Sequence, residues 1–220
     1  MNSNHLLLAG ICIALFFSAC KKSNDNQPAV TIPATYPDYS SFNVGNYWVY
    51  EEFLLDSTGT ATSLNRFDSC YVEKDTMINN QTYFKICKLK YNNPTQPEIS
   101  FQRDSLDYIV TSEGEILFSS QDFTTVFSSY YFITLPSDTL CLIEKKMTDK
   151  DQTITTPAGI FTTSNAKQTF YMYPNWSNFG TVRVRNNRYA ENIGLITETL
   201  PFYVSDPNYI ERKLARYHLN

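Results

Sequence analysis

The sequence predicts a mainly β protein with a single antiparallel β-sheet domain, curved into a half-barrel or an open barrel, and with few or no helices. From Phe42 onward, apolar and polar residues alternate with a period of two, and turn-forming residues separate the alternating segments. The chain has 16 Tyr and 15 Phe but only 7 Gly, a composition typical of β-sheet.

The first strong strand is predicted at residues 46–55, NYWVYEEFLL. Trp48 and Tyr50 share one face of this strand, and Tyr47 and Val49 share the other, because side chains alternate across a strand. Apolar residues on both faces indicate a central strand that is covered on both sides. We therefore expect its aromatic rings to belong to the core.

A hairpin is predicted next, from strands at residues 67–75 and 82–91 joined around Asn79-Asn80. Asn tolerates the left-handed backbone that both central residues of a type I′ turn require. A two-residue turn at this point sets the cross-strand pairs, which are Val72 with Cys87 and Cys70 with Leu89. These four residues would share a half-buried apolar face. The opposite, mostly polar face would hold Tyr71, Glu73, Lys88 and Lys90.

The alternating pattern continues to the C-terminus. A second hairpin is predicted over residues 105–120, with Glu113-Gly114 at its tip. Strands at residues 138–147 and 152–155 flank a predicted turn at residues 149–151, and further strands are predicted at residues 160–173, 181–185, 193–200 and 209–218. The last segment is ambiguous, because Ile210, Leu214 and Tyr217 also fit the period of a helix.

The N-terminus carries a targeting pattern. Residues 6–17 form an apolar run without a charge, shorter than the roughly 20 residues that span a bilayer. The run has the length of a secretory h-region, and small residues, Ser18 and Ala19, follow it. A buried core helix is the alternative, but it leaves the small-small-Cys ending unexplained. Residues 21–40 are rich in Pro, Asn, Ser and Thr, which is typical of an extended tether.

The motif Phe17-Ser18-Ala19-Cys20 resembles a bacterial lipobox. The resemblance implies cleavage before Cys20 and acylation of its thiol and new amino group, so that two or three chains hold the protein at a membrane. The implied organisation is a lipoprotein signal peptide at residues 1–19, a lipidated Cys20 with a flexible tether at 20–40, and an antiparallel β domain at 41–220.

A second resemblance covers most of the domain. The stretches are VGNYWVYE (44–51), TPAGIFTT (156–163), YAENIGLITET (189–199) and the terminal ERKLARYH. Together they resemble a widespread group of uncharacterised Bacteroidota-type lipoproteins. The resemblance implies an antiparallel β-rich domain of half-barrel form, and it brings no catalytic residue.

Charge and cysteine content exclude several classes of protein. A net charge of −4 without a large basic cluster argues against nucleic-acid binding. Removal of the signal and lipidation of Cys20 leave Cys70, Cys87 and Cys141, with no spacing typical of a metal or redox site. We favour small buried hydrophobic residues for these three, and a Cys70–Cys87 disulfide stays open.

Catalytic motifs are absent from the sequence. Beyond the signal, His218 is the only histidine, and no G-x-S-x-G, H-E-x-x-H or P-loop pattern occurs. We expect His218 to be structural or solvent-facing, and residues 149–151 to form a solvated turn rather than a Ca²⁺ site. No catalytic residue, metal or cofactor is predicted, and the protein is not expected to be an enzyme. A hydrolase built from distant acids such as Glu115 and Glu144 is an alternative.

Two aromatic residues are candidates for binding. Tyr173 and Trp176 lie in the loop-like stretch YPNWSNF, where an exposed Trp often marks an interaction site. A glycan or an envelope protein is the expected partner there, in addition to the membrane lipid that holds acylated Cys20.

The expected function is that of a membrane-anchored envelope lipoprotein with a non-enzymatic binding or assembly role. Lys21 and Lys22 directly after Cys20 resemble outer-membrane sorting, and the side of the membrane is left open. One alternative is a carrier of an apolar or lipid ligand, which predicts a cavity lined by Phe, Leu and Ile. The other is the extracytoplasmic hydrolase, which predicts carboxylates converging in a cleft.

Overall fold

The computed structural model describes residues 35–90, 93–134, 138–178, 180–201 and 209–220. Residues 35–220 form one compact unit. The described residues contain twelve strands and one short 3₁₀ helix, η1 (Pro174–Trp176), which confirms the predicted fold class. The strands are β1 (Tyr47–Leu55), β2 (Ala61–Ile78), β3 (Gln81–Lys90), β4 (Asn93–Ser105), β5 (Tyr108–Thr111), β6 (Ile116–Ser119), β7 (Val126–Thr134), β8 (Asp138–Thr156), β9 (Gly159–Met172), β10 (Val182–Ala190), β11 (Gly194–Pro201) and β12 (Tyr209–His218).

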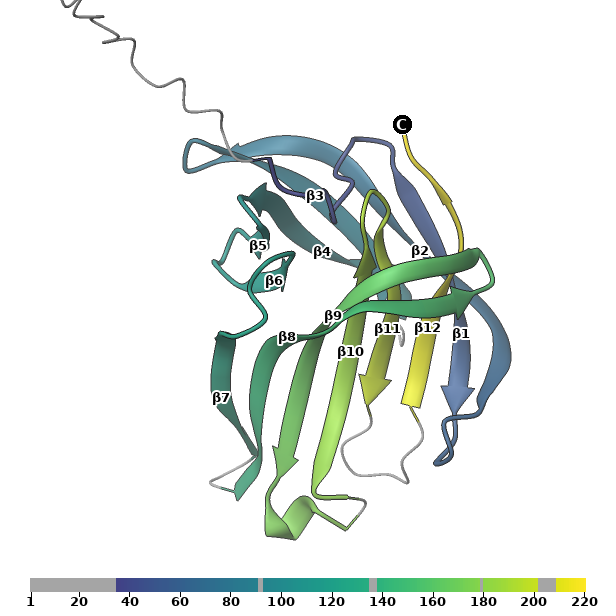
Figure 1. Ribbon diagram of the computed structural model, residues 1–220, viewed down its shortest axis with the longest axis vertical. Coiled ribbons are helices and arrows are strands. Elements are labelled where there is room, and N and C mark those ends of the chain that lie inside the picture. Colours follow the sequence, from purple (N-terminus) through teal and green to yellow (C-terminus); the bar gives the residue numbers. More distant parts are fainter. Residues whose placement is uncertain (1–34, 91–92, 135–137, 179, 202–208) are drawn as a thin grey trace, which may run out of the picture. The chain divides into compact units, whose positions relative to one another are not determined.

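All twelve strands belong to one antiparallel sheet in the order β6-β5-β4-β3-β2-β1-β12-β11-β10-β9-β8-β7. The first and last strands therefore pair in the middle, with Tyr47 opposite His218 and Leu55 opposite Tyr209. This pairing shows that the last segment is a strand and not a helix. Consecutive strands β6 and β7 stand at the two ends of the sheet (Figure 1).

The sheet curls into a nearly closed barrel. Its β6 end reaches the strands of the other half, because the Phe118 ring lies 4.7 Å from the Tyr189 ring of β10. The backbone N–H of Ser119 also donates to Met147 Sδ of β8 at 3.4 Å. Each of these contacts involves a side chain, since β6 pairs in the sheet with β5 alone. The curl leaves one concave face inside.

The segment that leads into β1 is part of the fold. The ring of Tyr39 lies 4.7 Å from that of Phe118, and Ser40 is only 4% exposed. The Ser40 hydroxyl donates to Asp104 Oδ2 of β4 at 2.7 Å, and the N–H of Asn192 donates to the Asp38 carbonyl at 2.6 Å. This segment thus links the two halves of the sheet across the concave side.

The predicted register of the β2–β3 hairpin is wrong by one residue. The turn itself is as predicted, with positive φ at Asn79 (51°) and Asn80 (61°). A β-bulge at Glu73 then leaves an unpaired residue in β2, so that the cross-strand pairs are Val72 with Ile86, Tyr71 with Cys87, and Cys70 with Lys88. Because the side-chain period is two, this shift exchanges the faces of β3. Lys88 therefore faces the concave side, and Cys87 the opposite side.

The predicted turn at residues 149–151 is also wrong. Strand β8 runs without a break from Asp138 to Thr156, and β9 pairs with it on both sides of the irregularity. The extra residues form a bulge, in which Asp149 and Asp151 adopt positive φ, a conformation that Asp tolerates. The Asp149 carboxylate accepts hydrogen bonds from Asn165 at 2.9 Å and Arg188 at 3.2 Å. Both partners hold the bulge in place.

The central core lies under the middle of the sheet. Trp48 and Tyr50 are 4% and 1% exposed and pack with Val72, Ile196 and Leu214. This confirms the expectation that the aromatic rings of β1 are core residues. Their polar atoms are satisfied, since Trp48 Nε1 donates to the Ile193 carbonyl at 2.7 Å and Tyr50 Oη to the Leu195 carbonyl at 2.9 Å.

We predict that Leu214→Ala lowers the free energy of unfolding by about 2 to 5 kcal/mol, because it opens a cavity in the fully buried central core. Urea unfolding followed by tryptophan fluorescence measures the effect. Ile160→Ala is the matched control, since Ile160 is 71% exposed and its truncation should change stability by less than about 0.5 kcal/mol. Equal urea midpoints for the two variants would contradict this core assignment.

Candidate ligand-binding cavity

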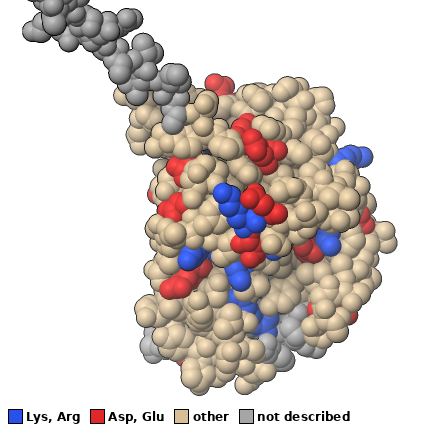
Figure 2. Space-filling view, viewed as in Figure 1, with Lys and Arg blue, Asp and Glu red and all other residues tan. Residues whose placement is uncertain are grey.

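A cavity of about 370 Å³ lies inside the curve of the sheet. Residues of β1 to β6, of the β5–β6 turn and of β10 and β11 line it, together with Ser40 and Phe42. Figure 2 shows charged side chains of both signs gathered along the middle of one face, with mostly uncharged surface around them. The lining comprises a polar wall, an aromatic wall, an ionic cluster and a set of aliphatic residues, which are Ile86, Ile99, Ile109, Leu117 and Leu195.

The polar wall comes mainly from β4 and the β5–β6 hairpin. Glu98, Ser100 and Gln102 alternate along β4, so their side chains share its concave face. Thr111 of β5 and two residues of the following turn, Glu113 and Glu115, extend this wall. The three glutamates are exposed, which places them at the rim.

The aromatic wall comes from the central strands and the segment before β1. Its rings are those of Phe42, Trp48, Tyr50 and Tyr189. The hydrogen bonds of Trp48 and Tyr50 to carbonyls near the β10–β11 turn hold these two rings in position. Burial raises the pKa of both Tyr50 and Tyr189 above the ordinary tyrosine value, so both phenols are neutral at physiological pH.

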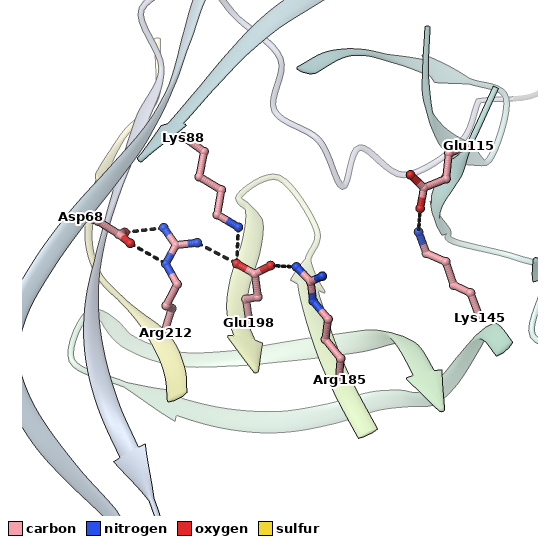
Figure 3. A network of polar contacts seen from close by, with 7 residues as sticks. All are labelled: Asp68, Lys88, Glu115, Lys145, Arg185, Glu198 and Arg212. Atoms are coloured by element: carbon pink, nitrogen blue, oxygen red, sulfur yellow. Dashed lines mark hydrogen bonds and ion pairs between the residues drawn. The ribbon is translucent and has the colours of Figure 1, made fainter. Parts of the chain in front are cut away.

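An ionic cluster stands between these walls, and Arg212 of β12 is at its centre (Figure 3). The guanidinium is 1% exposed and donates to both carboxylate oxygens of Asp68 on β2, with Nε to Oδ2 at 2.8 Å. Its Nη1 donates to Glu198 Oε2 of β11 at 2.7 Å. The guanidinium also lies 4.6 Å from the centre of the Tyr50 ring. Arg212 thereby joins three strands.

Two further cations complete the cluster around Glu198. Lys88 of β3 donates to Oε2, and Arg185 of β10 donates to Oε1. Burial alone would raise the pKa of Glu198, but Lys88, Arg185 and Arg212 outweigh it and hold the pKa well below its ordinary value of 4.5. Glu198 is therefore ionised, and it lines the cavity together with Lys88 and Arg185.

A separate ion pair spans from the rim to β8. Lys145 Nζ, on a side chain that is 3% exposed, donates to Glu115 Oε1 at 2.7 Å. Burial lowers the pKa of Lys145, and the neighbouring Glu115 carboxylate partly offsets this effect. Figure 3 shows this pair apart from the Glu198 cluster, where it joins the β5–β6 turn to β8.

The aromatic binding candidates lie elsewhere. Trp176 is in η1, packs partly buried against the cluster around Leu140 and Phe170, and donates from Nε1 to Asp138 Oδ2 at 3.0 Å. Tyr173 is 40% exposed and makes an edge-to-face contact with Tyr131. Neither residue lines the cavity, and their role in binding stays a prediction.

The acids and the histidine considered for catalysis are not brought together. Glu115 lines the cavity, but Glu144 precedes Lys145 on β8 and so lies on the opposite face of that strand. His218 is exposed and stacks on Tyr47 at 5.7 Å between ring centres. In the part of the chain that the structure describes, no three His, Cys, Asp or Glu residues are grouped as a metal site.

The three cysteines of the domain are free thiols, and two of them, Cys87 and Cys141, are buried. Cys70 lines the cavity, and burial raises its pKa to about 11. The shifted register places Cys70 and Cys87 on opposite faces of the sheet, an arrangement that does not allow a disulfide between them. Cys20 lies outside the described residues. Among the described residues, no helix has the length and hydropathy to cross a membrane.

Sequence reasoning missed the ionic cluster. The predicted register places Lys88 on the mostly polar face, away from Cys70 and Val72. A signal did exist, because Arg212 lies between Ile210 and Leu214 in one alternating row, and Glu198 lies between Ile196 and Leu200 in the neighbouring row. A charge inside an apolar row on two adjacent strands indicates a buried ion pair.

No protein-family model and no curated protein matches the chain. Two solved structures are similar in fold. A protein from Bacteroides fragilis, provisionally described as exported and as having a YmcC-like fold, is 11% identical, with a TM-score of 0.48, over 83% of this chain and 99% of that chain. A protein from Parabacteroides distasonis, provisionally described as a lipoprotein, is 12% identical, with a TM-score of 0.44, over 84% of this chain and 100% of that chain. These similarities assign no activity, ligand or location to this chain.

We predict that Glu198→Gln lowers the free energy of unfolding by about 3 to 5 kcal/mol at pH 7, because it leaves three cations around a neutral group. The folded-state pKa of Glu198 is depressed, so its contribution is present above pH 4.5 and is lost as the pH falls through the folded-state value. The difference between wild type and variant should therefore shrink below about pH 4.5.

Urea midpoints of both proteins between pH 3 and 7 test this expectation. The exposed Glu191→Gln is the control and should follow the wild type throughout. A difference that is constant over the whole pH range would show that charge at Glu198 does not carry the stabilisation.

Proposed function

We propose that the protein is a lipid-anchored lipoprotein of the cell envelope that binds a small ligand inside its curved sheet without catalysing a reaction. The observation that carries the binding role is the cavity of about 370 Å³. Its volume is within the range of pockets that take drug-sized ligands. Its walls are preformed, because buried ion pairs and backbone hydrogen bonds position the side chains behind it.

The proposed anchor rests on the sequence. The apolar run, the small residues Ser18 and Ala19, and Cys20 followed by a polar stretch support lipidation at Cys20. Lys21 and Lys22 favour the outer membrane, on either side of it. The tether would let the domain meet a diffusible ligand, a glycan or an envelope protein at some distance from the lipid surface.

The cavity differs from that of an apolar-ligand carrier. Such a carrier would have Phe, Leu and Ile on all sides. Ile and Leu residues do line part of this cavity, but Glu98, Ser100 and Gln102 place a row of polar groups along β4. An apolar ligand would strip water from these polar groups without replacing its hydrogen bonds. The lining therefore favours a ligand with polar groups of its own.

Carboxylates do line the cavity, as the hydrolase alternative expects. A general acid needs a raised pKa to stay protonated at neutral pH. Hydrogen bonds from Ser112 and the backbone lower the pKa of Glu113, and the surrounding cations lower that of Glu198. These directions support a binding role over acid catalysis, and we propose that the protein is not an enzyme.

We predict that Cys20→Ala, or treatment with globomycin, moves the protein out of the membrane fraction or blocks its processing, because the acyl chains are the proposed anchor. Fractionation and immunoblotting measure this. Cys12→Ala is the matched control and should fractionate like the wild type. Membrane association and processing that persist in the Cys20 variant would contradict the lipoprotein assignment.

We predict that Ser100→Phe abolishes ligand retention, because a ring at this position fills the cavity. The protein is equilibrated with a small-molecule extract of the cell envelope, washed and extracted, and the extract is analysed by mass spectrometry. Ser129→Phe is the control, since Ser129 is exposed on β7 and outside the lining. If wild type and Ser100→Phe retain the same molecules, or none, the cavity is not a binding site.

A further inference from the structure

We propose that the cavity takes a small polyhydroxylated molecule of mono- or disaccharide size. This inference rests on the proposed function, since it names the ligand class of the same site. The two unlike walls of the cavity and the unpartnered acceptor Asn187 Oδ1 beside them carry it. The site is distinct from the aromatic stretch around Trp176, which packs on another cluster.

The polar wall offers a row of hydrogen-bonding groups at regular spacing. Glu98, Ser100 and Gln102 are two residues apart on β4, so their backbone positions repeat at about 7 Å along one face. Gln102 Nε2 donates to Ser100 Oγ at 2.7 Å, which leaves the Gln102 carbonyl and the Ser100 hydroxyl proton for a ligand. Thr111, Glu113 and Glu115 continue the row on the adjoining hairpin. Hydroxyls along the edge of a sugar can bond to several of these groups at once, whereas a ligand with one polar end can reach few of them.

The opposite wall suits the apolar faces of a sugar ring. Phe42, Trp48, Tyr50 and Tyr189 border the cavity there. The ring C–H groups of a sugar present a flat apolar surface that can pack on aromatic side chains, while its hydroxyls point sideways. A molecule with both kinds of surface matches both walls in one orientation.

The lining offers hydrogen-bond acceptors to a ligand. Asn187 Oδ1 is buried beside the cavity and has no hydrogen-bond partner among the described residues. The carboxylates of Glu98 and Glu113 are further acceptors at the rim, and the cations Lys88 and Arg185 already donate to Glu198. A ligand that brings several O–H donors complements such a lining.

An anionic amphiphile such as a fatty acid fits less well. Its carboxylate would meet Glu98, Glu113 and Glu115 at the rim, and like charges repel. Within the cavity, it would find Lys88 and Arg185 already paired with Glu198. Its chain would leave the acceptors of the polar wall without partners, and this desolvation opposes binding.

The test uses the full-length protein, purified from membranes in a detergent without a sugar head group. The probes are glucose, N-acetylglucosamine, maltose and cellobiose, with decanoate as the apolar anion. Saturation-transfer difference NMR detects binding and isothermal titration calorimetry measures affinity. We expect at least one saccharide to bind, with decanoate showing no binding at the same concentration.

Variants connect this binding to the cavity. Gln102→Leu should weaken saccharide binding about tenfold, because it removes one hydrogen-bonding group from the polar wall. Glu98→Gln, a near-isosteric change at the exposed rim, is the second variant and should also weaken it. Gln152→Leu is the control on an exposed site outside the lining and should leave affinity unchanged. Urea midpoints close to that of the wild type show that each variant is folded.

Each outcome decides between the two proposals. Binding of decanoate alone, blocked by Ser100→Phe, overturns the saccharide inference and leaves the proposed binding function intact. Saccharide binding that neither Gln102→Leu nor Ser100→Phe affects places the ligand elsewhere and overturns the inference. Binding of no saccharide also overturns it. The proposed function itself fails only in the retention experiment with Ser100→Phe.

Discussion

The buried Arg212 guanidinium is the interaction on which the arrangement of the concave face depends. It bonds to Asp68 on β2 and to Glu198 on β11, while Lys88 of β3 and Arg185 of β10 bond to the same glutamate. Strands β1 and β12 are the chain-terminal strands and meet in the middle of the sheet. The cluster therefore ties the half of the sheet formed by β1 to β6 to the half formed by β7 to β12. A buried charge without partners is strongly unfavourable, so these strands must keep their positions relative to one another for the cluster to be satisfied.

One irregularity in the backbone brings Lys88 into the cluster. The bulge at Glu73 turns Lys88 toward the concave face, opposite Cys70. A regular hairpin from the same Asn79-Asn80 turn would point Lys88 outward and bring Cys87 inside. Glu198 would then lose one of the cations that hold its pKa low. One extra residue in a strand thus changes which residues meet inside the sheet.

The cavity has two unlike walls because different strands contribute different inward rows. The β4 row is polar, with Glu98, Ser100 and Gln102, and the wall opposite it is aromatic. An all-apolar interior would give the folded domain a higher stability, because polar walls bury little apolar surface. A preformed polar wall opposite fixed rings is an arrangement suited to recognition, and it agrees with a binding role in which the domain holds a small, partly polar ligand.

The sequence by itself determined the class of fold, most of the strands, the Asn-Asn and Glu-Gly turns and the core position of the β1 aromatics, because alternation and turn chemistry are local properties. The targeting pattern at Cys20 is also local, and lipidation there stays a prediction. Tertiary structure decided the rest. The strand identity of residues 209–218 came from pairing with β1, far away in sequence. The bulges at Glu73 and at residues 149–151 came from register against neighbouring strands. The ionic cluster arises only where β2 and β3 face β10, β11 and β12, which are far away in sequence, and no local pattern specifies which inward residues of the two groups will meet.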